Sequence, residues 1–227
     1  MDIEEKVTQL AELGAGWVMW LLVAMSIVCL AIVLERAWVL WRTGEAEGER
    51  EELEGLLRAG DRIAALERSQ QASGLTAQVI REGLSRADAG PKAIEERAAA
   101  ASERERLRLE RRLGFLGTVG NNAPFVGLLG TVIGIIRSFQ EMSRAGGELT
   151  SGLTAEIGEA LVATAVGLLV ALPAVFFFNL FQRAIRRRLA RASATAREVV
   201  ALLFELESRR NPLRSYFPAE SAREAAE

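Results

Sequence analysis

Two threonines and one carboxylate stand out because they lie within or beside long stretches without charge. Thr131 and Thr164 each lie in such a stretch, and Glu159 borders the second. Each threonine belongs to a stripe of small residues at steps of three and four, a spacing that keeps side chains on one helical face. The stripes are Gly120, Pro124, Gly127, Thr131, Gly134 and Ser138, then Ala160, Thr164, Gly167, Ala171 and Ala174. Narrow helix faces that carry a hydroxyl are typical of the lining of an ion pore.

The two threonines are predicted to lie at the same depth in a membrane. If the two stretches cross in opposite directions, matching their ends places Leu113 level with Gln182 and Ile136 level with Ala160. The same register places Thr131 level with Thr164. Two hydroxyls that meet at one depth favour a polar constriction, although a threonine hydroxyl in lipid also bonds readily to the carbonyl one turn back.

Glu159 is the carboxylate closest to this pair. It precedes Thr164 by five residues and therefore lies about 7.5 Å away along the helix. A carboxylate at the rim of the hydrocarbon is unfavourable against lipid, so we expect it to face the helix bundle or a water-filled cavity. The plainer interpretation is an acid favoured by the dipole at a helix start, which fits Glu156 better.

Polar and helix-distorting residues predict a vestibule at the other end of the two helices. Asn121 and Asn122 precede Pro124 in the first stretch, and Pro173 lies in the second. Each proline frees a backbone carbonyl one turn back, which a membrane helix tolerates where water or a neighbour takes the bond. The register places Asn122 level with Pro173, so the amide and the freed carbonyl are expected to lie at one depth.

Glycines on the stripes predict close helix packing. Gly127, Gly130, Gly134 and Gly167 are the glycines in question, and small residues four apart let membrane helices approach closely. Taken alone, this pattern favours packing over function. It keeps open the alternative of a membrane scaffold that conducts nothing.

The elements that carry these residues follow from where charge is missing. Residues 13–34, 113–136 and 160–182 contain no Asp, Glu, Lys or Arg. Each stretch exceeds the roughly 20 residues that cross about 30 Å of hydrocarbon. We predict an all-α fold with three transmembrane helices. The runs from Pro91 to Arg112 and from Arg183 to about Arg210 have no helix breaker, so helices two and three are expected to continue into a cytoplasmic bundle.

Arginines and tryptophans predict the orientation. Arginines cluster after the first and third stretches and before the second, which places residues 42–112 and the C-terminus in the cytoplasm and the N-terminus outside. The arginines are Arg36, Arg42, Arg104, Arg106, Arg108, Arg111, Arg112, Arg183, Arg186, Arg187, Arg188 and Arg191. Trp17 and Trp20 mark the outer interface of helix one, and Trp38 and Trp41 the inner one.

The apolar stretches lack any group that could bind and release a proton. The chain has no histidine and one cysteine, Cys29, and no nucleophile–base pair is visible, so we expect no enzyme activity, metal site or cofactor. No buried charge is available for a substrate, which disfavours a small-molecule transporter. Threonine does not titrate at useful pH. If protons move here, another chain must supply the titrating carboxylate.

The two threonine-bearing segments resemble a known family. NAPFVGLLGTVIGIIRSF (122–139) and IGEALVATAVGLLVALPAVFFFN (157–179) resemble the ExbB/TolQ/MotA proton-channel family, most of all the three-helix ExbB/TolQ branch, which the Glu35–Arg36 pair also suits. The strong match covers residues 114–182. The predicted segments are then a periplasmic amphipathic segment (1–13), transmembrane helix 1 (14–41), a cytoplasmic helical loop (42–112), transmembrane helix 2 (113–137), a periplasmic loop (138–158), transmembrane helix 3 (159–182), a cytoplasmic helix (183–210) and a flexible tail (211–227).

The resemblance also implies a function and partners. It implies a homo-pentamer in the bacterial inner membrane, around an ExbD/TolR-like one-helix subunit whose membrane aspartate carries the proton. Thr131 and Thr164 match the family's pore-lining threonines, and Glu159 matches its helix-three glutamate. Such a motor uses the proton motive force for work that a TonB/TolA-like transducer carries to the outer membrane. We expect TonB-type energy transduction for nutrient uptake, with a Tol-type envelope-maintenance or gliding-motility motor as the alternative.

Overall fold

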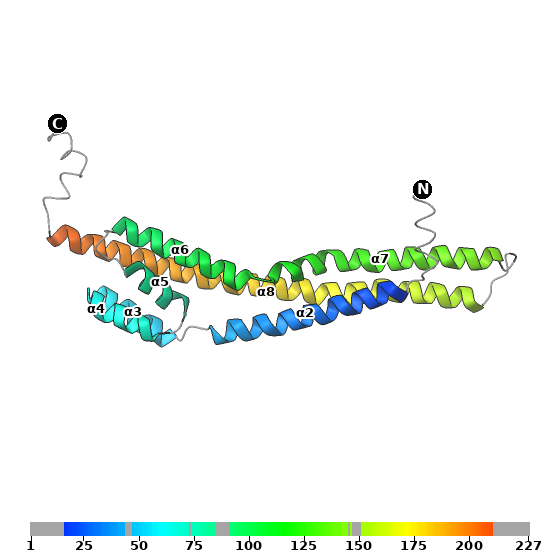
Figure 1. Cartoon of the computed structure of the whole chain (residues 1–227), viewed down its shortest axis with the longest axis horizontal. Coiled ribbons are helices and arrows are strands. Elements are labelled where there is room, and N and C mark those ends of the chain that lie inside the picture. Colours follow the sequence, from blue (N-terminus) through cyan, green and yellow to red (C-terminus); the bar gives the residue numbers. More distant parts are fainter. Residues whose placement is uncertain are drawn as a thin grey trace, which may run out of the picture. The chain divides into compact units, whose positions relative to one another are not determined.

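The computed structural model describes residues 16–43, 47–72, 74–84, 91–144, 146 and 151–210. Within this part of the chain every regular element is a helix, which confirms the predicted all-α fold there. The helices, labelled as in Figure 1, are α2 (Gly16–Arg42), α3 (Glu47–Arg58), α4 (Arg62–Gln71), α5 (Leu75–Leu84), α6 (Pro91–Glu110), α7 (Leu113–Arg144) and α8 (Ser151–Arg210). The predicted amphipathic segment (1–13) and tail (211–227) lie outside the described residues.

Three helical segments are long and apolar enough to cross a membrane, as predicted. They are Gly16–Arg42, Leu113–Arg144 and Thr154–Glu198. Many large apolar side chains on these segments are exposed, among them three of the four tryptophans, Trp20, Trp38 and Trp41, all on α2. An exposed apolar surface of this extent marks contact with lipid or another chain.

The prediction that the second membrane helix continues the preceding run without a break was wrong. α6 ends at Glu110 and α7 begins at Leu113, with Arg112 between them at a φ of 66°, in the left-handed region. Arg112 Nη1 donates a 2.6 Å hydrogen bond to Glu35 Oε2, and Phe115 N–H donates to the Arg112 carbonyl at 3.2 Å. This ion pair with α2 and the backbone bond of the turn account for the break. The third helix does continue, as one element to Arg210.

The chain divides into two compact units. The first contains the described residues of Met1–Trp38 and Arg111–Gln182, which are most of α2, all of α7 and the first part of α8. Its interior contains small residues of α7 and α8, such as Gly127 and Ala163, and larger ones, such as Leu116 of α7 and Val18 and Leu22 of α2, which are fully buried. A Cβ built on Gly130 of α7 would lie 3.2 Å from Val18 Cγ1, so α2 packs on α7 at this glycine.

The second unit contains the described residues of Val39–Glu110 and Arg183–Glu227. Two apolar clusters hold it together: Leu53, Leu57, Ala65, Ala72, Ala77, Ile80 and Ile94 in one, and Leu75, Val79, Ala98, Ala101 and Ala192 in the other. The start of α4 is fixed by a capping residue, because Asp61 accepts a 3.0 Å hydrogen bond from Ala64 N–H. Arg188 of α8 donates to the Leu40 carbonyl at 2.6 Å and so caps the last turn of α2.

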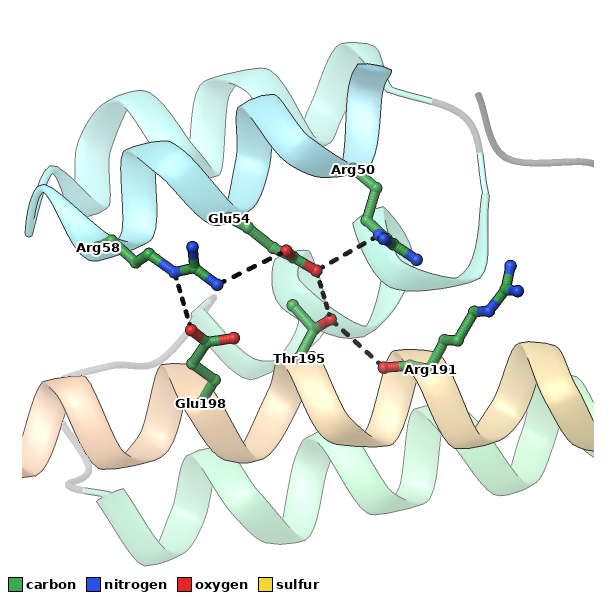
Figure 2. A network of polar contacts seen from close by, with 6 residues as sticks. All are labelled: Arg50, Glu54, Arg58, Arg191, Thr195 and Glu198. Carbon is green, nitrogen blue, oxygen red and sulfur yellow. Dashed lines mark hydrogen bonds and ion pairs between the residues drawn. The ribbon is translucent and has the colours of Figure 1, made fainter. Parts of the chain in front are cut away.

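A polar network joins α3 to α8 within the second unit (Figure 2). Thr195, which is buried, donates a 3.1 Å hydrogen bond to Glu54 Oε1, and Glu54 also pairs with Arg50 at 3.4 Å. Arg58 pairs with Glu198 at 2.9 Å. This hydrogen bond and the charge of Glu198 raise the pKa of Arg58 above its ordinary value. Each turn of this α8 face therefore carries a polar contact to α3.

Candidate functional site

Thr131 of α7 and Thr164 of α8 lie side by side, as the antiparallel register predicts. Thr164 Oγ1 donates to Thr131 Oγ1 at 3.5 Å, which is longer than the usual O–H···O hydrogen bond and makes this a weak contact. Thr131 Oγ1 in turn donates to the Leu128 carbonyl at 2.7 Å on its own helix. Thr131 therefore makes both contacts that the sequence suggested: its hydroxyl donates to a carbonyl on its own helix and accepts from the Thr164 hydroxyl on the other helix.

Glycines bring the two helices close enough for this contact. A Cβ on Gly127 would lie 2.8 Å from the Ala163 carbonyl oxygen, and a Cβ on Gly167 would lie 2.7 Å from the Ala123 carbonyl oxygen. Real Cβ atoms do not approach a carbonyl oxygen so closely, so only glycine fits at either position without a backbone shift. Gly130 and Gly134 are packed in the same way, against Ala163 and Ala160. The four glycines therefore set the helix spacing.

The two threonines differ in how far they are exposed, and this difference determines from which side another chain can reach them. Thr131 is only 9% exposed, whereas Thr164 is half-buried. The two backbones are in contact at Gly127 and Gly167, about one helical turn from the threonines. The pair is therefore reached from the open side of Thr164, and not through a gap between α7 and α8.

Glu159 is exposed on α8, one turn and a half before Thr164. Whether it faces a bundle or a cavity in an assembly stays a prediction. Glu156, three residues earlier, is half-buried and pairs with Arg137 of α7 at 3.5 Å. Among the described residues, no group of three or more His, Cys, Asp or Glu side chains gathers in a way that could hold a metal ion.

Whether the predicted vestibule residues line a vestibule stays a prediction, and the shared depth of Asn122 and Pro173 does not lead to a hydrogen bond between them. Asn121 and Asn122 are exposed, and Pro124 and Pro173 are each accommodated inside a continuous helix. Asn122 Nδ2 donates at 2.7 Å to the Thr118 carbonyl on its own helix, and not to the carbonyl that Pro173 frees. A carbonyl one turn back on the same helix is the nearer acceptor, which explains the difference.

Two ion-pair contacts between the membrane-spanning helices were not predicted from the sequence. Arg112 and Arg36 both bind Glu35, at 2.6 and 3.0 Å, and Arg137 binds Glu156. A signal existed, because Glu35, Arg112 and Arg137 are the charged residues that bound the uncharged stretches. Charges at the ends of neighbouring membrane helices share one depth and can pair, just as the threonines do.

Comparison with known proteins agrees with this architecture. A sequence model of the MotA/TolQ/ExbB proton channel family matches residues 71–194. The biopolymer transport protein ExbB of Salmonella typhimurium is 33% identical over 96% of this chain and 91% of its own length. The Tol-Pal system protein TolQ of Pseudomonas aeruginosa is 35% identical over 66% of this chain, and ExbB of Xanthomonas campestris pv. campestris is 40% identical over 54%. In these last two the match spans 60% and 47% of the relative.

Proposed function

Because the chain belongs to the MotA/TolQ/ExbB proton channel family, we propose that it is the proton-channel subunit of a motor driven by the proton motive force. The observation that carries this proposal is the Thr131–Thr164 hydroxyl pair, fixed by glycine contacts between two helices with no titratable side chain in their apolar stretches. Hydroxyls can pass a proton along hydrogen bonds but cannot store it at useful pH. In the proposed motor, the storing group belongs to another chain.

The partner we propose is a one-helix subunit of ExbD/TolR type with an aspartate in its membrane segment. Its aspartate would approach the pair from the open side of Thr164, since the α7–α8 contact is closed at Gly127 and Gly167. A pentamer of this chain around that subunit would place several such faces around one axis. Exposed apolar residues on α7 and α8, such as Phe139 and Leu169, provide surface for these contacts.

We place the protein in the bacterial inner membrane, with the N-terminus in the periplasm and the C-terminus in the cytoplasm. The arginines at one end of each membrane segment support this orientation. Glu159 and the α7–α8 connection would then lie on the periplasmic side, where protons enter. Each proton that crosses would release about 2.3 kcal/mol per 100 mV of membrane potential.

The work we propose is TonB-type energy transduction for nutrient uptake, through a TonB-like transducer. The near-complete match to a biopolymer transport protein ExbB supports this system, because the match to a Tol-Pal system protein TolQ covers less of the chain. A Tol-type motor for envelope maintenance remains the alternative. Both share the site described here.

The test is proton flux into membrane vesicles that contain this chain and a one-helix, aspartate-bearing subunit of ExbD type. Thr164→Val should lower the flux by roughly tenfold, the rate equivalent of about 1.4 kcal/mol, because valine keeps the shape and removes the hydroxyl. The matched control is Thr118→Val, since the Thr118 hydroxyl bonds only within α7, to the Gly114 carbonyl at 3.0 Å. If the Thr164→Val complex assembles and conducts like the wild type, the hydroxyl pair does not line the proton path.

A further inference from the structure

Arg137 and Glu156 form an ion pair across the loop ends of α7 and α8. Arg137 Nη2 lies 3.5 Å from Glu156 Oε1, and the two side chains are 38% and 23% exposed. Among the described residues, most ion pairs join residues on one helix or within the second unit. This pair instead links the two helices that carry the hydroxyl pair, one turn beyond their last close contact, at Gly134 and Ala160.

Backbone packing fixes the direction of Glu156. The Glu156 carbonyl oxygen would lie 3.5 Å from a Cβ on Gly134, so this turn of α8 presses against α7. Glu156 Oε2 is buried as well. The carboxylate is thus turned into the contact between the helices, toward Arg137.

Glu159 is the neighbour of Glu156 on the surface of α8. Residues three apart in a helix are adjacent, and two carboxylates at this spacing repel each other. The structure separates them, because Arg137 holds Glu156 toward α7 while Glu159 stays exposed. The described charges nearest to them on α7 are Arg137 and Glu141, and Glu141 pairs with Arg144 at 3.4 Å.

We propose that Arg137 is a positioning residue that neutralises and withdraws Glu156, so that Glu159 is the free member of these two α8 carboxylates at this end of the proton path. This inference rests on the proposed function. Without Arg137, the charge of Glu156 is no longer compensated and competes with Glu159 for the arriving proton. Removing both Arg137 and Glu156 leaves Glu159 alone again.

If the proposal is right, Arg137 is not needed for proton flux once Glu156 has been removed. If the ion pair instead served only to hold α7 and α8 together, removing both residues would be as harmful as removing Arg137 alone. In the vesicle assay, Arg137→Gln should lower proton flux by roughly five- to tenfold, the effect of an uncompensated like charge one turn away at the edge of a low-dielectric region. Arg137→Lys should keep most of the flux, because it retains the charge. Glu156→Gln and the double variant Arg137→Gln/Glu156→Gln should both conduct like the wild type.

A second pair of variants keeps the test decisive if Arg137→Gln fails to assemble. Ala155 is exposed and lies four residues before Glu159, so Ala155→Glu adds an uncompensated carboxylate while the Arg137–Glu156 pair stays intact. We expect Ala155→Glu to reduce flux and Ala155→Gln to leave it unchanged. Equal flux in these two variants would overturn the proposal, as would a double Arg137/Glu156 variant no better than Arg137→Gln. Absence of flux in the wild-type complex would instead contradict the proposed function itself.

Discussion

At the residue scale, Gly127 shows how little freedom the helix contact allows. The atom that a Cβ on Gly127 would meet is the Ala163 carbonyl oxygen, which belongs to the backbone and cannot rotate away. The Thr164 Cα would lie at 3.0 Å from the same Cβ, so the clash falls beside the hydroxyl pair. Even a methyl group at this position must push α7 and α8 apart.

Gly127→Ala should therefore destabilise the protein, by about 1–3 kcal/mol, as is usual for overpacking. Thermal unfolding of the purified protein in detergent measures this. Gly114→Ala is the matched control on the same helix, because nothing lies within 4 Å of a Cβ there and alanine favours the helix by about 1 kcal/mol. A Gly127→Ala protein as stable as Gly114→Ala would contradict the close contact.

At the element scale, the boundary between α6 and α7 depends on one arginine. Arg112 adopts a φ of 66°, which glycine tolerates and other residues adopt at a cost of about 1–2 kcal/mol. Its pair with Glu35 compensates for this conformation. The turn is thus stabilised by an ion pair and not by the residue that usually ends a helix.

Comparing two substitutions at Arg112 separates the cost of its backbone conformation from the contribution of its ion pair. Arg112→Gly and Arg112→Ala both remove the pair with Glu35, but only alanine keeps the backbone strain. We expect Arg112→Ala to be less stable than Arg112→Gly by about 1 kcal/mol in thermal unfolding. Equal stabilities would mean that the turn relaxes into continuous helix once the arginine is gone.

The attachment of α3 to α8 makes a second prediction at this scale. Glu54→Ala removes the acceptor of the buried Thr195 hydroxyl and the partner of Arg50, so α3 should exchange its amide hydrogens faster. The Arg191 carbonyl oxygen lies 3.3 Å from Thr195 Oγ1 and can accept the single hydroxyl proton once Glu54 is gone, so the loss should be about 1 kcal/mol, the low end for a buried polar group. Glu51→Ala, an exposed change on α3, is the control for mass-spectrometric hydrogen exchange. Unchanged exchange across residues 47–58 in Glu54→Ala would show that apolar packing alone holds α3.

At the scale of the whole molecule, the features that could be predicted from the sequence are those that depend on the distribution of charge and on residue size. Uncharged stretches predicted the three membrane-spanning segments, and matching their ends predicted the level of Thr131 and Thr164. The break at Arg112 had no signal, because the residue in the left-handed conformation is not a glycine. Asn122 followed the rule that a nearby carbonyl on the same helix is preferred over a distant one. The depths of Arg137 and Glu156 indicated that the two could pair, but which of the α8 carboxylates Arg137 binds depends on side-chain directions, which residue spacing alone does not give.

All four tryptophans of the chain lie on α2, at positions 17, 20, 38 and 41. Intrinsic fluorescence of the unlabelled protein therefore reports on that single helix. The two pairs lie near opposite ends of α2, and one member of the first pair and both of the second are exposed. Brominated lipids that quench at chosen depths can thus locate both ends of α2 in a bilayer, and a change in the emission spectrum can follow its movement during proton flow without any engineered probe.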